Sequence, residues 1–212
     1  MYRTTPGLGC RAAVSPPELT LSPSPWPLER YRPLLRLQAR SLQIGAQLRR
    51  RFDQSDVVQE TLVRAHRAAA QFRGDTEGEL VAWLQRILAN TLKELMRKEL
   101  AEQCNPDREE EIAAAVSHSS MRLEQFAVAR GDTPSQALQR AEVVVRVAAA
   151  VDRLDANQRD VIVLREMQGL PLKEISDRMG KTEKAVAGLL LRGRKRLREL
   201  LAMYQKEGDD VR

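Results

Sequence analysis

The sequence has few of the residues that build disulfide scaffolds or metal sites. Its only cysteines are Cys10 and Cys104, and neither has a second cysteine or a histidine nearby at the spacing of metal ligands. No run of about 18 apolar residues is present, so we expect no membrane insertion. The chain therefore lacks the marks of disulfide-rich, zinc-stabilised and membrane-embedded proteins, and we expect no metal and no other cofactor.

Aromatic residues are also scarce. They make up 4% of the chain, which leaves little material for a β-sheet outside short Val runs. Leu, Ala, Arg, Glu and Gln, which are compatible with helix, are abundant. We therefore predict an all-α protein, made of two small helical domains joined by a flexible linker.

The net charge of +6 and the pI near 9.7 suit a polyanionic partner, although many basic proteins bind no nucleic acid. The N-terminus has no apolar segment of the kind found in signal peptides, because prolines interrupt it as far as residue 27. We therefore expect a cytoplasmic protein.

Composition and periodicity divide the chain into five segments. Helical patterns are expected at about 29–47, 54–70 and 80–99 in the first domain, with a loop over 72–78. The linker has room for one short helix and is long enough to let the two domains sit well apart. The segments are a disordered Pro-rich tail (1–27), a first domain (28–100), a linker (101–134), a second domain (135–204) and a disordered tail (205–212).

The predicted helix from Leu80 carries two separate stripes. At 100° per residue, an apolar stripe lies on one side and a polar row on another. The polar row could follow a phosphate backbone, and it consists of Arg86, Asn90, Lys93 and Arg97. Trp83 lies at the border, where it could stack on an unpaired base. The alternative is that Trp83 belongs to the core and the basic row is only solvated.

The C-terminal segment has the pattern of a helix-turn-helix. A capping box at Asp155 and a final Gly169 predict one helix over 156–168. A short helix, a turn at Gly180 and a long helix capped by Thr182 follow. The long helix is strongly basic, as a DNA-binding helix would be. A helical hairpin with a solvated basic face is the alternative.

Several motifs occur together in the order of a known family. Residues 53–60 read DQSDVVQE and resemble the D-x-x-D-[LV]-V-Q-E signature of the extracytoplasmic-function sigma factors. Further similar segments follow at 72–75, 83–90, 154–161, 169–175 and 192–197. The resemblance covers about 28–201 apart from the linker, and it implies a sigma region 2-like helical bundle followed by a region 4-like helix-turn-helix.

The resemblance also implies partners and site residues. Core RNA polymerase and promoter DNA are the implied partners, with an anti-sigma factor as a further candidate. For polymerase binding it implies the helix face of Asp53, Asp56, Gln59 and Glu60. For the −10 element it implies Phe72, Arg73, Gly74, Asp75, Trp83, Arg86, Asn90, Lys93 and Arg97. For the −35 element it implies Thr182, Glu183, Lys184, Arg192, Arg194, Lys195 and Arg196. Without the family, Asp53 is simply a helix N-cap and Asp56 a first-turn acid.

The chain departs from the family at the start of the recognition helix. Many members carry Lys-Ser-Arg where this chain has Ala187, Gly188 and Leu189. The basic residues can still bind phosphates, which position a domain on DNA without specifying sequence. We therefore expect weak direct readout of the −35 element by this helix.

Three other functions fit the sequence less well. A helix-turn-helix repressor or activator that never joins the polymerase would explain the second domain but not the motifs of the first, and a helical adaptor explains still less. An enzyme is not expected, because His66 and His118 stand apart from any nucleophile, metal cluster or Gly-rich phosphate loop. No catalytic residue is predicted.

Overall fold

All regular elements in the residues that the structure describes are helices, which confirms the predicted all-α class. The computed structural model describes residues 26–42, 53–99, 106–128 and 137–209. In chain order its elements are η1 (Leu28–Tyr31), α1 (Arg32–Ser41), α3 (Gln54–Ala68), η2 (Ala69–Gln71), α4 (Glu77–Glu99), α5 (Pro106–Val128), α6 (Ala137–Asp152), α7 (Ala156–Ile162), the π-helical turn η3 (Val163–Met167), α8 (Leu172–Met179) and α9 (Glu183–Asp209).

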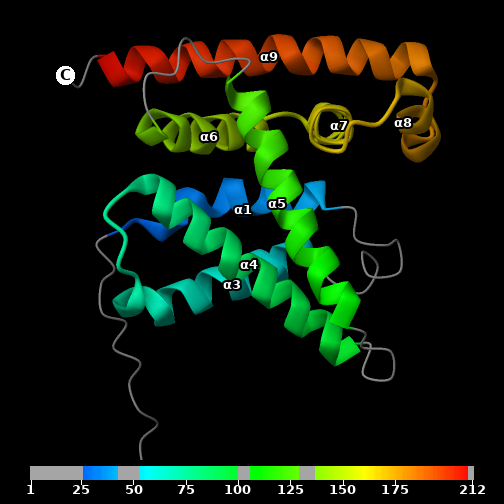
Figure 1. Ribbon diagram of the computed structural model, residues 1–212. Helices are drawn as coiled ribbons and strands as arrows, with labels where there is room; N and C mark the ends of the chain where they lie inside the picture. The colour runs from blue at the N-terminus through cyan, green and yellow to red at the C-terminus, as the bar shows by residue number, and fades with distance from the viewer. Residues whose placement is uncertain (1–25, 43–52, 100–105, 129–136, 210–212) are drawn as a thin grey trace, which may run out of the picture.

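The helices form two groups (Figure 1). Helices α1, α3 and α4 make the first group, α6 to α9 make the second, and α5 crosses both. Each helix buries an apolar stripe. In the first group, Leu34, Leu62 and Leu84 are fully buried, and in the second Ile162 and Leu197 are. Burying side chains of this size stabilises the fold by about 1.5–3 kcal/mol each.

The two groups are in direct contact through α1, which packs along α6. Two ion pairs lie at this contact. Arg36 Nη1 is 3.2 Å from Asp152 Oδ2, and Arg40 Nη1 is 3.7 Å from Asp160 Oδ1. All four side chains are partly exposed, so each pair contributes at most about 1 kcal/mol, and the apolar packing dominates. The two groups therefore lie side by side here, whereas the sequence suggested that they sit well apart.

Residues 106–128, placed in the flexible linker by the sequence analysis, form the 23-residue helix α5. This helix is longer than the short one expected, and it packs against α1, α4, α6 and η3. Its buried residues Ile112, Val116, Leu123 and Phe126 follow helical spacing and face the core. The acidic run and the Ser/His cluster of this segment suggested a loop. On this amphipathic helix Glu110, Glu111, Ser117 and His118 are exposed, whereas Ser119 is buried and its hydroxyl bonds that of Ser41.

Other boundaries differ by a few residues. Helix α4 begins at Glu77 rather than Leu80, because Thr76 and Glu79 cap its first turn. Helix α9 continues to Asp209, so residues 205–209, assigned to a disordered tail, are helical. Trp26 and Pro27, assigned to the N-terminal tail, lie within the described structure. The remaining tail and linker residues, 1–25, 101–105, 129–136 and 210–212, lie outside the described residues.

Candidate functional site

The first candidate surface is the outer face of α3. Asp53 is the N-cap, and its Oδ1 accepts a hydrogen bond of 2.9 Å from the backbone N–H of Ser55. One and two turns further along, Asp56 and Gln59 are exposed. Gln59 Oε1 accepts a hydrogen bond of 3.0 Å from Arg32 on α1. The α3 outer face is therefore a small polar surface held at a fixed angle to α1.

Glu60, assigned to the same surface, is bound within the chain. Its Oε1 lies 2.7 Å from Nε of Arg64, and Nη1 of Arg64 lies 2.7 Å from Oε2 of Glu94 on α4. These ion pairs raise the pKa of the Arg64 guanidinium. Glu60 therefore joins α3 to α4 as well as bordering the α3 outer face.

The second candidate surface contains three aromatic rings. Phe72 follows η2, and its ring centroid lies 5.1 Å from that of Trp83 on α4. On the other side, the ring of Trp26 meets Phe72 edge-on at 6.4 Å. All three rings are half-buried and pack against the core. Trp83 therefore has one part packed against Phe72 and the core and another part accessible to solvent.

The backbone passes close beneath this aromatic group at Gly74. A Cβ placed on Gly74 would lie 2.4 Å from Cζ of Phe72 and 2.9 Å from Cβ of Glu79, so a larger residue would displace the ring. The loop is tied to α4 by the carboxylate of Glu79, which accepts hydrogen bonds from the hydroxyl of Thr76 and from the N–H groups of Thr76 and Asp75. These hydrogen bonds lower the pKa of the Glu79 carboxyl, and the bond from the Thr76 hydroxyl has the largest effect. Arg73 and Asp75 beside them are exposed.

The polar row predicted on α4 lies beside this loop surface. Arg86, Asn90 and Arg97 are exposed and Lys93 is half-buried, whereas Leu84 and Leu88 on the opposite side are fully buried. The sequence prediction of separate core and basic stripes on this helix is confirmed by these burial classes.

The third candidate surface is the helix-turn-helix of α8 and α9. Gly169 and Gly180 have left-handed φ angles of 74° and 61°, as the predicted turns require. Thr182 Oγ1 accepts a hydrogen bond of 3.2 Å from the N–H of Ala185 and caps α9. The tip of α9 is open, because Thr182, Glu183 and Lys184 are all exposed.

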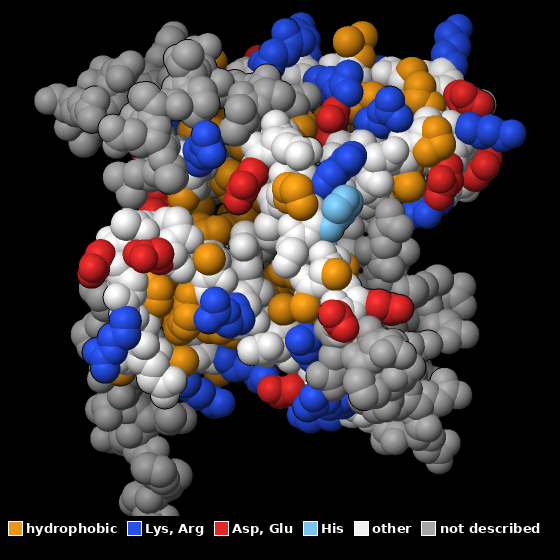
Figure 2. Space-filling model, viewed as in Figure 1, with side chains coloured by type: hydrophobic (Ala, Val, Ile, Leu, Met, Phe, Trp, Pro, Cys, Tyr) orange, Lys and Arg blue, Asp and Glu red, His pale blue; other side chains and the backbone are white. Residues whose placement is uncertain are grey.

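The basic residues of α9 differ in their availability. Arg192 and Lys195 are exposed. Arg196 is also exposed, and its Nη1 lies 3.1 Å from Oε2 of Glu199. Arg194 is half-buried, and its Nε and Nη2 donate hydrogen bonds of 2.9 and 2.6 Å to Oε1 of Glu166 on η3. Arg194, assigned to DNA from the sequence, thus holds α9 against η3. Figure 2 shows Lys and Arg side chains along the outer edge of α9, with hydrophobic side chains among them.

Sequence reasoning missed three residues of these surfaces. Trp26 completes the aromatic group, Glu166 binds Arg194, and the guanidinium of Arg122 on α5 lies over Gly169, 2.7 Å from where a Cβ would be. The only signal for Trp26 was that it is one of two tryptophans in the chain and directly precedes the first helix. The other two contacts join residues far apart in the sequence, and no local pattern marks them.

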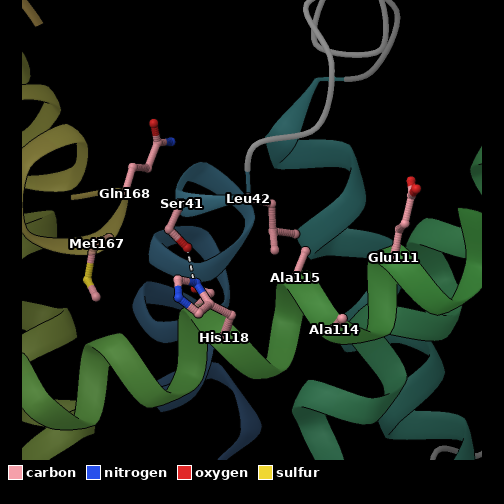
Figure 3. Close-up of a pocket in the computed structure, with 9 residues that line it drawn as sticks. Ser41, Leu42, Glu111, Ala114, Ala115, His118, Met167 and Gln168 are labelled. Atoms are coloured by element: carbon pink, nitrogen blue, oxygen red, sulfur yellow. Dashed lines mark hydrogen bonds between the residues drawn. The ribbon is translucent and has the colours of Figure 1, made fainter. Parts of the chain in front are cut away.

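An open pocket of about 420 Å³ lies where α1, α5 and η3 meet (Figure 3). It contains Ser41 and His118, but the hydroxyl of Ser41 bonds the carbonyl of Gln38 and the hydroxyl of Ser119. Glu111 lies two turns from His118 on α5, about 10 Å along the axis. These groups are not arranged as nucleophile, base and acid. Within the described ranges there is also no cluster of potential metal ligands and no helix long and apolar enough to cross a membrane.

Comparisons with known proteins match two stretches of the chain to the sigma-70 family. The family "Sigma-70 region 2" matches residues 28–101, and "Sigma-70, region 4" matches residues 145–197. The chain is 33% identical over 153 residues to the RNA polymerase sigma factor CnrH of Cupriavidus metallidurans, covering 70% of this chain and 73% of that protein. It is 29% identical over 161 residues to the ECF RNA polymerase sigma factor SigM of Mycobacterium tuberculosis, covering 76% of this chain and 69% of that protein. Among solved structures it is 25% identical to the sigma factor RpoE in complex with the anti-sigma factor NepR from Bartonella quintana. That match covers 82% of this chain and 94% of the other, with a TM-score of 0.30.

Proposed function

The chain belongs to the extracytoplasmic-function type of RNA polymerase sigma factor, and we propose that three of its surfaces divide the work of transcription initiation. As a sigma factor it binds core RNA polymerase and directs promoter recognition and opening. The proposal is supported by one observation above all: the region 2 match covers η1 to α4, and the region 4 match covers the helix-turn-helix. The alternative of a repressor that never joins the polymerase leaves the region 2 match unexplained.

In this assignment, the α3 outer face binds core polymerase, the aromatic loop and the polar row of α4 hold the melted −10 strand, and α9 holds the −35 element. The family is one of non-enzymatic initiation factors. A cytoplasmic location follows from the polymerase as partner. An anti-sigma factor is a candidate third partner, which affinity purification from the source cells would identify.

Reversing charge on the α3 outer face should weaken polymerase binding. The double variant Asp56→Arg, Gln59→Arg places two cations where the native face offers an acid and an amide. Since carboxylates there would meet Arg side chains of the partner, we expect a loss of about 2 kcal/mol or more, which is over tenfold in Kd. The measurement is equilibrium binding to purified core polymerase. Glu60 is a poorer position, because its ion pair with Arg64 helps to join α3 to α4, whereas Gln59→Arg gives up one exposed hydrogen bond to Arg32.

A matched control is Glu124→Arg, which reverses an exposed charge on α5. This variant should bind core polymerase like the wild-type protein. Circular dichroism would verify that all variants are helical, and run-off transcription would show whether lost binding lowers initiation. Unchanged core binding by the Asp56, Gln59 double variant would overturn the assignment of the α3 outer face.

Arg192 and Arg194 should differ in their effect on the salt dependence of promoter binding. Each cation that neutralises a phosphate adds about 0.9 to the slope of log K against log salt. Arg192→Ala should therefore flatten the slope by about 0.9 in a salt titration of holoenzyme on promoter fragments. Arg194→Ala should change the slope far less and lower thermal stability instead, because Arg194 is bound to Glu166. Equal flattening by both variants would show that Arg194 leaves Glu166 to reach DNA.

A further inference from the structure

The outward face of α9 carries an unexplained apolar side chain. Leu191 is 68% exposed, more than either of the other exposed large hydrophobic residues of the described structure, Met121 and Met203. The preceding Leu190 is 8% exposed and belongs to the core. A single exposed leucine is ordinary on a protein surface, so its exposure alone marks no site. What distinguishes Leu191 is its position among the basic residues of the helix-turn-helix.

Leu191 lies at the centre of a basic face. At 100° per residue, the side chains that lie within about 60° of it and within two turns along the helix are those of Lys184, Ala187, Gly188, Arg194, Lys195 and Arg198. Gly188 and Arg194 are half-buried, and the others are exposed. The opposite side of the helix holds Val186, Gly193 and Leu197, which are buried. An occupant of this face must therefore be anionic at its edges and offer an apolar group near its centre.

On the outward face of α9, the residues one turn before Leu191 are small. Ala187 and Gly188 project little beyond the backbone of the helix. A Cβ on Gly188 would lie 3.3 Å from Nη1 of Arg192, so the Arg192 guanidinium lies along the helix at this point. Leu189 is half-buried against the core and faces away from the outer surface. The first turns of α9 can therefore approach a groove closely, and Leu191 is the large side chain that projects from them.

Duplex DNA meets both requirements of this face. Its phosphates suit the cations at the edges, and in the major groove its one exposed apolar group is the C5-methyl of thymine. The nine residues from Glu183 to Leu191 span about 13 Å, comparable with the major-groove width of about 12 Å. Building on the proposed role of α9, we propose that Leu191 reads thymine methyl groups in the upstream promoter element. This apolar contact supplies sequence readout where polar readers are lacking at Ala187, Gly188 and Leu189.

The rotation of α9 about its axis is fixed by the fold. Arg194 is bound to Glu166, and Gly193 lies against α7, where a Cβ would be 3.4 Å from Ile162 Cγ1. Both contacts lie within three residues of Leu191, Gly193 on the opposite side of the helix and Arg194 about 60° round from Leu191. Leu191 is therefore held facing outward before DNA binds, as a specificity-determining residue must be.

The test replaces thymine by uracil, which removes the methyl and leaves every hydrogen-bonding group of the base unchanged. Binding of wild-type holoenzyme and a Leu191→Ala holoenzyme would be measured on promoter fragments with thymine or uracil, first throughout the upstream element and then one position at a time. For the wild-type protein, each contacted methyl should contribute about fourfold in affinity, the value expected for one buried carbon. Leu191→Ala should weaken binding to thymine DNA and remove the difference between thymine and uracil.

The controls separate this inference from the proposed function beneath it. Met203→Ala removes another exposed apolar side chain of α9, 12 residues along the helix, and should retain full sensitivity to uracil. If Arg192→Ala weakens binding but uracil changes nothing for the wild-type protein, the methyl contact is wrong and the DNA role of α9 stands. If neither Arg192→Ala nor uracil has an effect, the role of α9 itself is wrong. If Leu191→Ala lowers core polymerase binding with no effect of uracil, the face binds protein, and the inference fails.

Discussion

Trp83→Ala should impair promoter opening about fivefold or more while changing duplex promoter binding little. An unpaired base stacked on an aromatic ring gains about 1–3 kcal/mol, and that gain favours strand separation and not the binding of paired DNA. The ring is available for this purpose, because Trp83 is half-buried at the edge of α4 with exposed Arg86 nearby. The measurement compares two quantities, the affinity of holoenzyme for duplex promoter fragments and the extent of melting. Melting is detected by the reactivity of unpaired thymines to permanganate.

A loss of packing must be separated from a loss of stacking in this experiment. Trp83 also contacts Phe72 at 5.1 Å, so its removal destabilises the loop. Ile87→Ala is the matched control, since Ile87 is another half-buried side chain of α4 that packs against the core. It should lower thermal stability and leave opening intact, and Trp83→Phe should restore much of the opening. Equal opening defects in Trp83→Ala and Ile87→Ala would show that Trp83 acts through packing alone.

Features that depend on local chemistry were predictable from the sequence. The N-caps at Asp53, Asp155 and Thr182 are where their side chains and spacing indicated, and the two turns at Gly169 and Gly180 are left-handed as expected. Each of these is determined by residues within one helical turn. The separate stripes on α4 follow from periodicity in the same way.

Features that depend on tertiary contacts were not predictable. The closeness of the two helical groups rests on α1 meeting α6, elements about 100 residues apart in the chain. The pairing of Arg194 requires Glu166 on η3, and no sequence spacing marks that pair. Composition was misleading for α5, because Ser, His and Glu are frequent in loops but equally suit the solvated side of a helix. The resemblance to the family suggested the surfaces, and the contacts show which of their residues also bind within the fold.

Gly193→Leu should destabilise the helix-turn-helix by about 1–3 kcal/mol, the usual cost of overpacking a close contact. A Cβ at this position would lie 3.4 Å from both Gln158 Cβ and Ile162 Cγ1, so the side chain beyond it must push α9 away from α7. Gly193→Ala adds only that Cβ, and the helix propensity gained over glycine, up to about 1 kcal/mol, offsets the crowding. The alanine variant should therefore be near wild type in stability.

Gly188→Ala is the matched control for this prediction. Its Cβ would meet the end of the flexible Arg192 side chain at 3.3 Å, a neighbour that can move, so helix propensity should dominate and stability should rise slightly. Urea unfolding followed by circular dichroism measures all three variants. Because the contact of α9 with α7 determines which residues face the DNA, Gly193→Leu should also weaken binding of holoenzyme to the upstream element, even though the substituted residue faces the protein interior. A Gly193→Leu protein as stable as the wild type would mean that α7 and α9 can separate without loss, and that their close approach does not determine how Leu191 is presented.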